Sequence, residues 1–99
     1  MKLAVFLSDW RRTEETLERL KAEKMGIILV ENGIYHAVVK EGGKESPVLS
    51  KAGATFYALT DDLETRGYTA SNVSSKVKLV TYGDIVDLIM NEYEKTAWL

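Results

Sequence analysis

Four short runs of apolar residues recur along the chain, at residues 3–7, 27–30, 55–59 and 77–80. Within each run the apolar side chains follow one another and do not alternate with polar ones, which is typical of strands that are covered on both faces. The pattern therefore predicts four strands of a mainly parallel sheet.

Helical patterns lie between these runs. The clearest covers residues 82–93, where six apolar side chains repeat at the spacing of one helix face: Tyr82, Ile85, Val86, Ile89, Met90 and Tyr93. Thr81, with Asp84 three residues later, predicts a capping box at the start of this helix. A second helix is predicted over residues 13–24, with Leu17 and Leu20 directed inward.

A third helix is predicted to begin at Thr60, whose side chain would cap it. Asp61 and Asp62 occupy its first turn, where the helix dipole favours acids, and Gly67 ends it. Asp62 and Arg66 lie four residues apart on this helix, an acid before a base, and we expect the pair to stabilise the helix or its docking and to take no part in catalysis.

The Asn32-Gly33 pair has two interpretations. Between the apolar stretches 27–30 and 34–39, it is by local rules the strongest signal for a β-hairpin in the chain. Alternatively, Asn32 caps a short helix over residues 34–40, and the connection is a crossover. The local rules slightly favour the hairpin.

Length and charge limit the classes of function. A chain of 99 residues is expected to form a single domain over residues 1–99. The net charge is -2, and the only local basic pair, Arg11-Arg12, is followed closely by two glutamates, so no direct nucleic-acid binding is expected. The first apolar run is shorter than the roughly 7–15 residues of a secretory signal, and no run reaches the roughly 18 of a membrane span. We expect a soluble cytoplasmic protein with no membrane contact.

The chain has no cysteine, which excludes disulfides, thiolate metal sites and thiol nucleophiles. Its one histidine, His36, is predicted to lie on a helix surface. Gly42-Gly43 lacks the following Lys-Ser/Thr of a phosphate-binding loop and is predicted to be a turn. We assign no catalytic, cofactor-binding or metal-binding residue.

Polar residues follow the predicted strands, and in a parallel sheet ligands collect beyond the carboxyl ends of the strands. Asp9, Asn32 and Asp61 are the candidates for such a site. Helix capping explains the choice of Asn32, Thr60 and Thr81 equally well. Adjacent Asp61 and Asp62 diverge by about 100° on a helix and do not form a carboxylate pair.

Several short pieces of the chain match one known family: residues 31–35, Tyr57-Ala58-Leu59, Asp62-Leu63, Arg66-Gly67, Tyr82 with Asp84 and Val86, and Ala97-Trp98. Through them the chain resembles the DsrH/TusB family, small subunits of the DsrE-like sulfur-relay complexes, weakly before Gly26 and better after it. The resemblance implies a DsrE-like fold, which favours a helix after Asn32 over a hairpin. The expected order is then β-α-β-α-β-α-β-α, a layered α/β domain with a mainly parallel four-stranded sheet and right-handed crossovers.

The resemblance also implies a partnership with DsrE-like and DsrF-like subunits in a hetero-oligomer, or self-association in their absence. Such complexes relay sulfur as a cysteine persulfide, in many bacteria toward 2-thiouridine at the tRNA wobble position, and some members carry a cysteine in the first helix. Here that helix has none, so the resemblance suggests a non-catalytic subunit that positions a partner's persulfide cysteine. The alternative is a stand-alone small-ligand or metal-dependent enzyme that uses Asp9, Asn32 and Asp61.

Aromatic residues are enriched in protein interfaces. Three of them, Tyr35, Tyr93 and Trp98, are the predicted contact residues.

Overall fold

The computed structural model describes residues 2–9, 19–20, 22–40 and 42–99. These residues form a five-stranded, fully parallel sheet of strand order β4-β3-β2-β1-β5. The strands are β1 (Lys2–Leu7), β2 (Lys24–Leu29), β3 (Ala54–Leu59), β4 (Val77–Val80) and β5 (Lys95–Trp98). The α/β class, the parallel sheet and the four predicted strands are confirmed.

The prediction of four strands missed β5. This strand lies parallel to β1 at the edge of the sheet, in a register that pairs Leu3 with Lys95 and Phe6 with Trp98. The Glu94 amide donates to the Lys2 carbonyl oxygen at 2.8 Å and fixes the entry of β5. The last residues of the chain therefore complete the sheet, on the side of β1 opposite to β2.

The described helices are short. They are α2 (Tyr35–Val38), α3 (Thr60–Thr65) and α4 (Tyr82–Asn91), with three 3-10 turns named η1 (Glu31–Ile34), η2 (Pro47–Ser50) and η3 (Ala70–Asn72). β2 is followed by η1 and α2, and β2 and β3 are parallel, so the hairpin interpretation of Asn32-Gly33 is wrong and the helix that the resemblance favoured is confirmed. That helix ends at Val38, earlier than the predicted residue 40.

Two of the predicted helix ends, at Thr81 and at Gly67, are confirmed, and the predicted cap at Thr60 is wrong. Thr81 and Asp84 form the expected capping box on α4, with the Thr81 amide 3.0 Å from an Asp84 carboxylate oxygen. Thr60 does not cap α3: the N-cap residue is Leu59, and the Thr60 hydroxyl donates to the Val80 carbonyl oxygen at 3.1 Å. Gly67 ends α3 with a φ of 81°, as predicted.

The predicted helix over residues 13–24 lies largely outside the described residues. Its predicted end is wrong, because Lys24 is already the first residue of β2. Leu20 packs against the core as predicted, and Leu17 is outside the described part of the chain.

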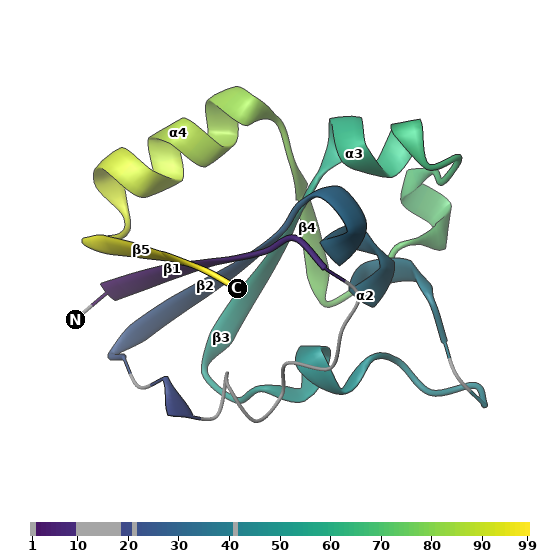
Figure 1. Cartoon of the computed structure of the whole chain (residues 1–99), viewed down its shortest axis with the longest axis horizontal. Coiled ribbons are helices and arrows are strands. Elements are labelled where there is room, and N and C mark those ends of the chain that lie inside the picture. Colours follow the sequence, from purple (N-terminus) through teal and green to yellow (C-terminus); the bar gives the residue numbers. More distant parts are fainter. Residues whose placement is uncertain (1, 10–18, 21, 41) are drawn as a thin grey trace.

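The side chains of the sheet form two apolar layers, one on each face. The first contains alternate residues of the central strands, such as Val5, Ile27 and Ala58, and is covered by α2, by η2 and by Leu63 of α3. The second contains the intervening residues, such as Phe6, Ile28 and Tyr57, and is covered by α4. In Figure 1, α4 lies above the sheet, and the segment over residues 42–53 lies below it.

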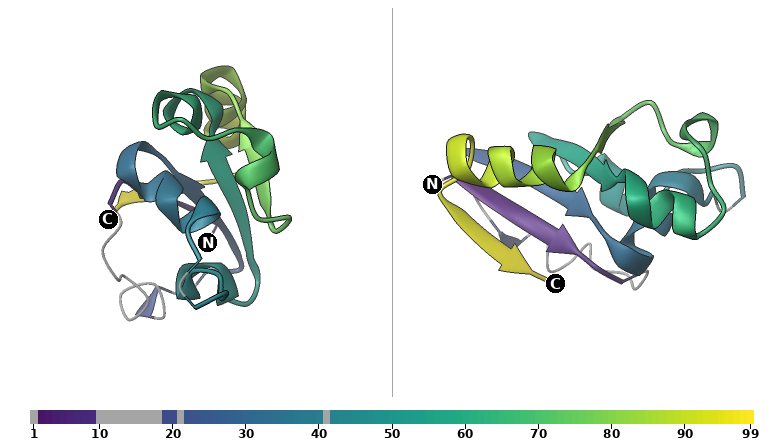
Figure 2. Two further views of the ribbon diagram at one scale, coloured as in Figure 1. Left: turned by 90° about the vertical axis from the view of Figure 1, so that its right-hand side faces the viewer. Right: turned by 90° about the horizontal axis from the view of Figure 1, so that it is seen from above.

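The topology explains why α4 is the only helix of the described residues that covers the second layer. β4 and β5 are the two edge strands, so the chain between them must pass over the whole face of the sheet. A ten-residue helix is about 15 Å long and about 10 Å wide, whereas five strands span about 19 Å. Seen from above, β5 and most of β1 lie to one side of α4 (Figure 2, right). No helix among the described residues is long and apolar enough to span a membrane.

Candidate functional site

A network of polar side chains joins η1 to α3 at the carboxyl ends of β2 and β3. The Arg66 guanidinium donates to the Asn32 side-chain oxygen from Nε at 3.2 Å and from Nη2 at 3.0 Å. Asp62 accepts from the Glu31 amide at 2.6 Å and lies 3.9 Å from Arg66 Nη1. Glu31 has a φ of 50°, which L-residues rarely adopt, so the bond from Asp62 holds an unfavourable backbone conformation in place.

The predicted Asp62–Arg66 pair therefore forms, and it does more than the expected helix stabilisation. Both side chains are about one-fifth exposed, and they connect two elements that are about 30 residues apart in sequence. Asn32 takes part as the acceptor for Arg66 and not as the predicted helix cap. Because Asp62 and Arg66 are both engaged in contacts within the protein, we interpret the network as structural.

The strand-end candidates for a ligand or metal site are not assembled into one. Asp9 offers its main-chain oxygen to His36, and Asn32 is engaged with Arg66. Asp61 is exposed, and its carbonyl oxygen accepts from the Thr65 hydroxyl. Within the described ranges, no three or more His, Cys, Asp or Glu side chains are grouped in a way that could hold a metal ion.

His36 is buried, with 3% of its surface exposed, so its predicted place on a helix surface is wrong. Its Nε2 lies 3.1 Å from the Asp9 carbonyl oxygen, which can only accept, so Nε2 carries the proton. Its Nδ1 lies 2.7 Å from Ser46 Oγ and accepts from that hydroxyl. Ser46 Oγ in turn accepts from the Val48 amide and caps η2. His36 therefore connects α2, η2 and the loop after β1.

The His36–Ser46 contact has the donor–acceptor arrangement of a base and a nucleophile, but both residues lie in the interior and the serine oxygen is committed to a helix cap. Sequence reasoning missed this pair. The signal was Ser46-Pro47, because serine before a proline in the first turn is a common helix start.

The three predicted contact residues lie in different environments. Tyr35 is half-buried and packs edge-on against the Tyr68 ring, with the ring centroids 6.0 Å apart. Trp98 is 62% exposed and stacks on Phe6 at 4.5 Å, on the face of the sheet that α4 covers. Tyr93 is only 6% exposed and lies beneath the last turn of the α4 region. Trp98 offers most surface to a partner, and Tyr93 offers little.

The buried Tyr93 side chain closes the core at the end of α4. Its hydroxyl lies against Gly26 so closely that a Cβ atom at that position would overlap it. Among the described residues this hydroxyl has no hydrogen-bond partner of normal geometry. Burial, and after it the nearby Tyr57 hydroxyl, raise the pKa of Tyr93 above its ordinary value. The phenol is therefore neutral at physiological pH.

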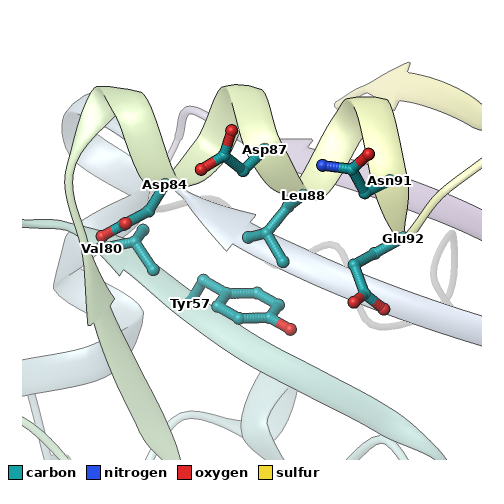
Figure 3. A pocket seen from close by; sticks show the side chains of 7 residues that line it. All are labelled: Tyr57, Val80, Asp84, Asp87, Leu88, Asn91 and Glu92. Atoms are coloured by element: carbon teal, nitrogen blue, oxygen red, sulfur yellow. The ribbon is translucent and has the colours of Figure 1, made fainter.

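A cavity of about 280 Å³ opens between α4 and the β3–β4 edge of the sheet. Tyr57, Val80 and Leu88 form its floor, and Asp84, Asp87, Asn91 and Glu92 form its rim (Figure 3). Lys24 forms an ion pair with Glu92, and their hydrogen bond lowers the pKa of the Glu92 carboxyl. The cavity thus combines an apolar and aromatic floor with a negatively charged rim.

The other flank of α4 carries exposed apolar side chains. Tyr82, Val86 and Met90 follow one another at intervals of four residues, so they form one row, and they are 60%, 57% and 76% exposed. The sequence pattern predicted these three on the buried face, and that prediction is wrong. The helix contacts the sheet through Ile85, Leu88 and Ile89, so half of the predicted apolar face is directed away from the core.

Comparison with known proteins places the chain among proteins of this fold. Over most of its length it is similar in structure to the Thermotoga maritima protein Tm0979, with a TM-score of 0.61 and 28% identity over 90% of this chain and 93% of that one. Another structure of Tm0979, described as a candidate sulfur transferase, matches with 32% identity, a TM-score of 0.54, and 83% and 80% coverage. The Methanobacterium thermoautotrophicum protein MTH1491 shares the fold, with a TM-score of 0.70 over 97% of both chains, at 14% identity.

Sequence relatives cover nearly the whole chain. The protein TusB of Photorhabdus laumondii subsp. laumondii is 32% identical over 99% of this chain and 100% of its own length. The protein TusB of Enterobacter sp. strain 638 is 30% identical over 92% of this chain and 93% of its own. The family model of DsrH-like proteins matches residues 8–95. The chain belongs to the DsrH family.

Proposed function

We propose that this protein is a non-catalytic subunit of a sulfur-relay complex, in which it positions the persulfide cysteine of a partner. One combination of observations carries the proposal: the chain matches the DsrH family over residues 8–95 and has no cysteine in its 99 residues. A persulfide forms only on a thiolate sulfur, so a chain without cysteine cannot carry the sulfur itself.

The proposed partners are DsrE-like and DsrF-like subunits in a hetero-oligomer in the cytoplasm, and the proposed end product is 2-thiouridine at the tRNA wobble position or a related sulfur acceptor. The names of the relatives, with the description of Tm0979 as a candidate sulfur transferase, support the pathway. The proposed contact residues on this chain are Tyr35, Tyr93 and Trp98, of which Trp98 is the most exposed and Tyr93 is 6% exposed.

The test is a sulfur-transfer assay with the complex assembled from this chain and the DsrE-like and DsrF-like proteins of the same organism. A cysteine desulfurase and radiolabelled cysteine supply the sulfur, and denaturing gels without reductant show which chain holds it. We expect covalent label on a cysteine-bearing partner, none on this chain, and faster transfer when this chain is present. The proposal would be contradicted by label that stays on this chain after denaturation, or by a rate of sulfur transfer that is the same with and without this chain.

The alternative, a stand-alone enzyme at the strand ends, finds no support in the arrangement of Asp9, Asn32 and Asp61. The Asn32 side-chain oxygen is engaged with Arg66, and the described residues contain no group of three or more His, Cys, Asp or Glu side chains that could hold a metal ion.

A further inference from the structure

The outer surface of α4 has two unusual features. Exposed apolar side chains, which are costly to leave in water, lie on one flank, and acidic side chains, which attract a positive charge, surround a cavity on the other. One flank carries the exposed row of Tyr82, Val86 and Met90. The other carries the cavity with Asp87 and Asn91 at its rim. We define the residues of the row and of the cavity rim together as the α4 surface.

The charged side chains that line the cavity are all acidic. Between residues 79 and 94 the sequence has four acids, Asp84, Asp87, Glu92 and Glu94, and no lysine, arginine or histidine. Lys78 pairs with Tyr57 in the register of β3 and β4, so it is on the same face of the sheet as the cavity floor, although it does not line the cavity. Lys24 forms an ion pair with Glu92, and the charge of Lys2 also lowers the pKa of Glu92. The row on α4 is therefore apolar, and the cavity rim around Asp84 and Asp87 is negatively charged.

We propose that the α4 surface is the docking site for a partner protein that presents a basic side chain among apolar ones. The arginine or lysine head group enters the cavity between Asp84, Asp87 and Asn91, and its aliphatic stem lies on Leu88 and Tyr57. Apolar neighbours of the basic residue cover the row on the other flank. An aromatic floor beneath a carboxylate rim suits such a group, because a cation is attracted by both the ring face and the carboxylates.

Charge complementarity selects this occupant over two others. A second copy that packed its own α4 against this one would bring the acids of both helices together, which costs free energy. A nucleic acid would place phosphates against the same carboxylates. A basic surface of a second copy could still dock here, but that contact would join two different patches and would build rings or filaments, a result visible in the oligomeric state.

The inference rests on the proposed function only in taking the chain to be a subunit, and its test needs no sulfur-relay protein. The probe is the blocked tetrapeptide Leu-Arg-Leu-Leu, titrated into the full ¹⁵N-labelled chain while amide chemical shifts are recorded. We expect saturable shifts at residues 82–92 and at Tyr57. The same peptide with citrulline in place of arginine is a neutral isostere, and we expect it to bind about two- to fivefold more weakly, the range for one partly exposed charge pair.

Matched variants test the acidic cavity rim and the apolar row of the α4 surface separately. Asp87→Asn should weaken the arginine peptide and leave the citrulline peptide unchanged, whereas Asp61→Asn, an equally conservative change at an exposed acid of α3, should change neither. Met90→Gln should weaken both peptides, because Met90 is 76% exposed and contributes apolar area without supporting the core.

Equal binding of the two peptides, or shifts spread over all the acidic residues, would overturn the proposal. It would also be overturned by sedimentation showing that the chain alone self-associates in a way that Asp87→Asn and Met90→Gln abolish, because the occupant would then be a second copy. Failure of the chain to join DsrE-like subunits would refute the proposed function and leave this result intact.

Discussion

The buried hydroxyl of Tyr93 makes a sharp prediction about stability. Tyr93 is 6% exposed, and its hydroxyl has no hydrogen-bond partner among the described residues. A buried polar group without a partner costs about 1–3 kcal/mol. Tyr93→Phe removes the oxygen and keeps the ring, including its contact with the Lys24 ammonium 5.0 Å from the ring centroid. A small void offsets part of the gain, so we expect the variant to be more stable by about 1 kcal/mol at neutral pH.

The same substitution should change how stability depends on pH. Burial raises the pKa of Tyr93 above its ordinary value of 10.0. Above pH 10 the unfolded chain therefore loses this proton while the folded chain keeps it, and the free energy of unfolding falls as the pH rises toward the folded pKa. The phenylalanine variant has no proton to lose at this position. Its advantage over the wild type should therefore grow from neutral pH to about pH 11.

The assay is urea unfolding followed by circular dichroism at both pH values, with Tyr82→Phe as the control. Tyr82 is the first residue of α4 and is 60% exposed, so the loss of its hydroxyl should leave the midpoint unchanged at either pH. For a chain of this length, about 1 kcal/mol corresponds to a rise of about 4–8 °C in the melting temperature. A lower midpoint in Tyr93→Phe would refute the reasoning and would mean that the hydroxyl is bonded in solution, with Tyr57 as the first partner to test by a double-mutant cycle.

Three further changes test other contacts by the same unfolding assay. Gly26→Ala should destabilise the fold by about 1–3 kcal/mol because its Cβ would overlap the phenol that packs on it. Gly83→Ala on α4 should be neutral or stabilising, because its Cβ would lie 3.7 Å from Thr81 Oγ1, an ordinary contact; equal effects would contradict the packing. Arg66→Ala should cost about 1–2 kcal/mol by removing both hydrogen bonds to Asn32, and an unchanged midpoint would show that the network contributes nothing. His36→Ala should cost about 2–4 kcal/mol, since it leaves a void and removes the hydrogen bonds of the imidazole to the Ser46 hydroxyl and the Asp9 carbonyl oxygen; a loss below 1 kcal/mol would mean that the site is open to water.

The local pattern predicted the four strands whose side chains are buried on both faces. Ile27, Ile28 and Leu29 of β2 are completely buried, so their run of apolar residues directly reflects their position in the sheet. β5 escaped because it is an edge strand with mostly exposed side chains, and its partner β1 lies about 90 residues earlier. No window of local sequence contains a pairing of that range.

The Asn32-Gly33 pair shows why the hairpin rule failed. The rule takes glycine as a sign of a tight turn with a positive φ. Gly33 is here for a different reason: a Cβ atom would overlap the Leu7 carbonyl oxygen, so η1 can pack against the end of β1 only with glycine at this position. Asn32 is needed as the acceptor for Arg66, which comes from α3. Both requirements arise from tertiary contacts that the sequence does not display.

The apolar face of α4 was predicted with the correct periodicity and the wrong extent of burial, and the topology explains the difference. A helix that joins the two edge strands must cross the sheet alone, because no second crossover passes over that face in the described chain. It can bury only the side chains that point straight at the sheet, Ile85 and Ile89 among them. The row of Tyr82, Val86 and Met90 on one flank and the cavity on the other are therefore consequences of the strand order. Their apolar and acidic composition is a property of the sequence, and it is this composition that the docking of a basic partner would explain.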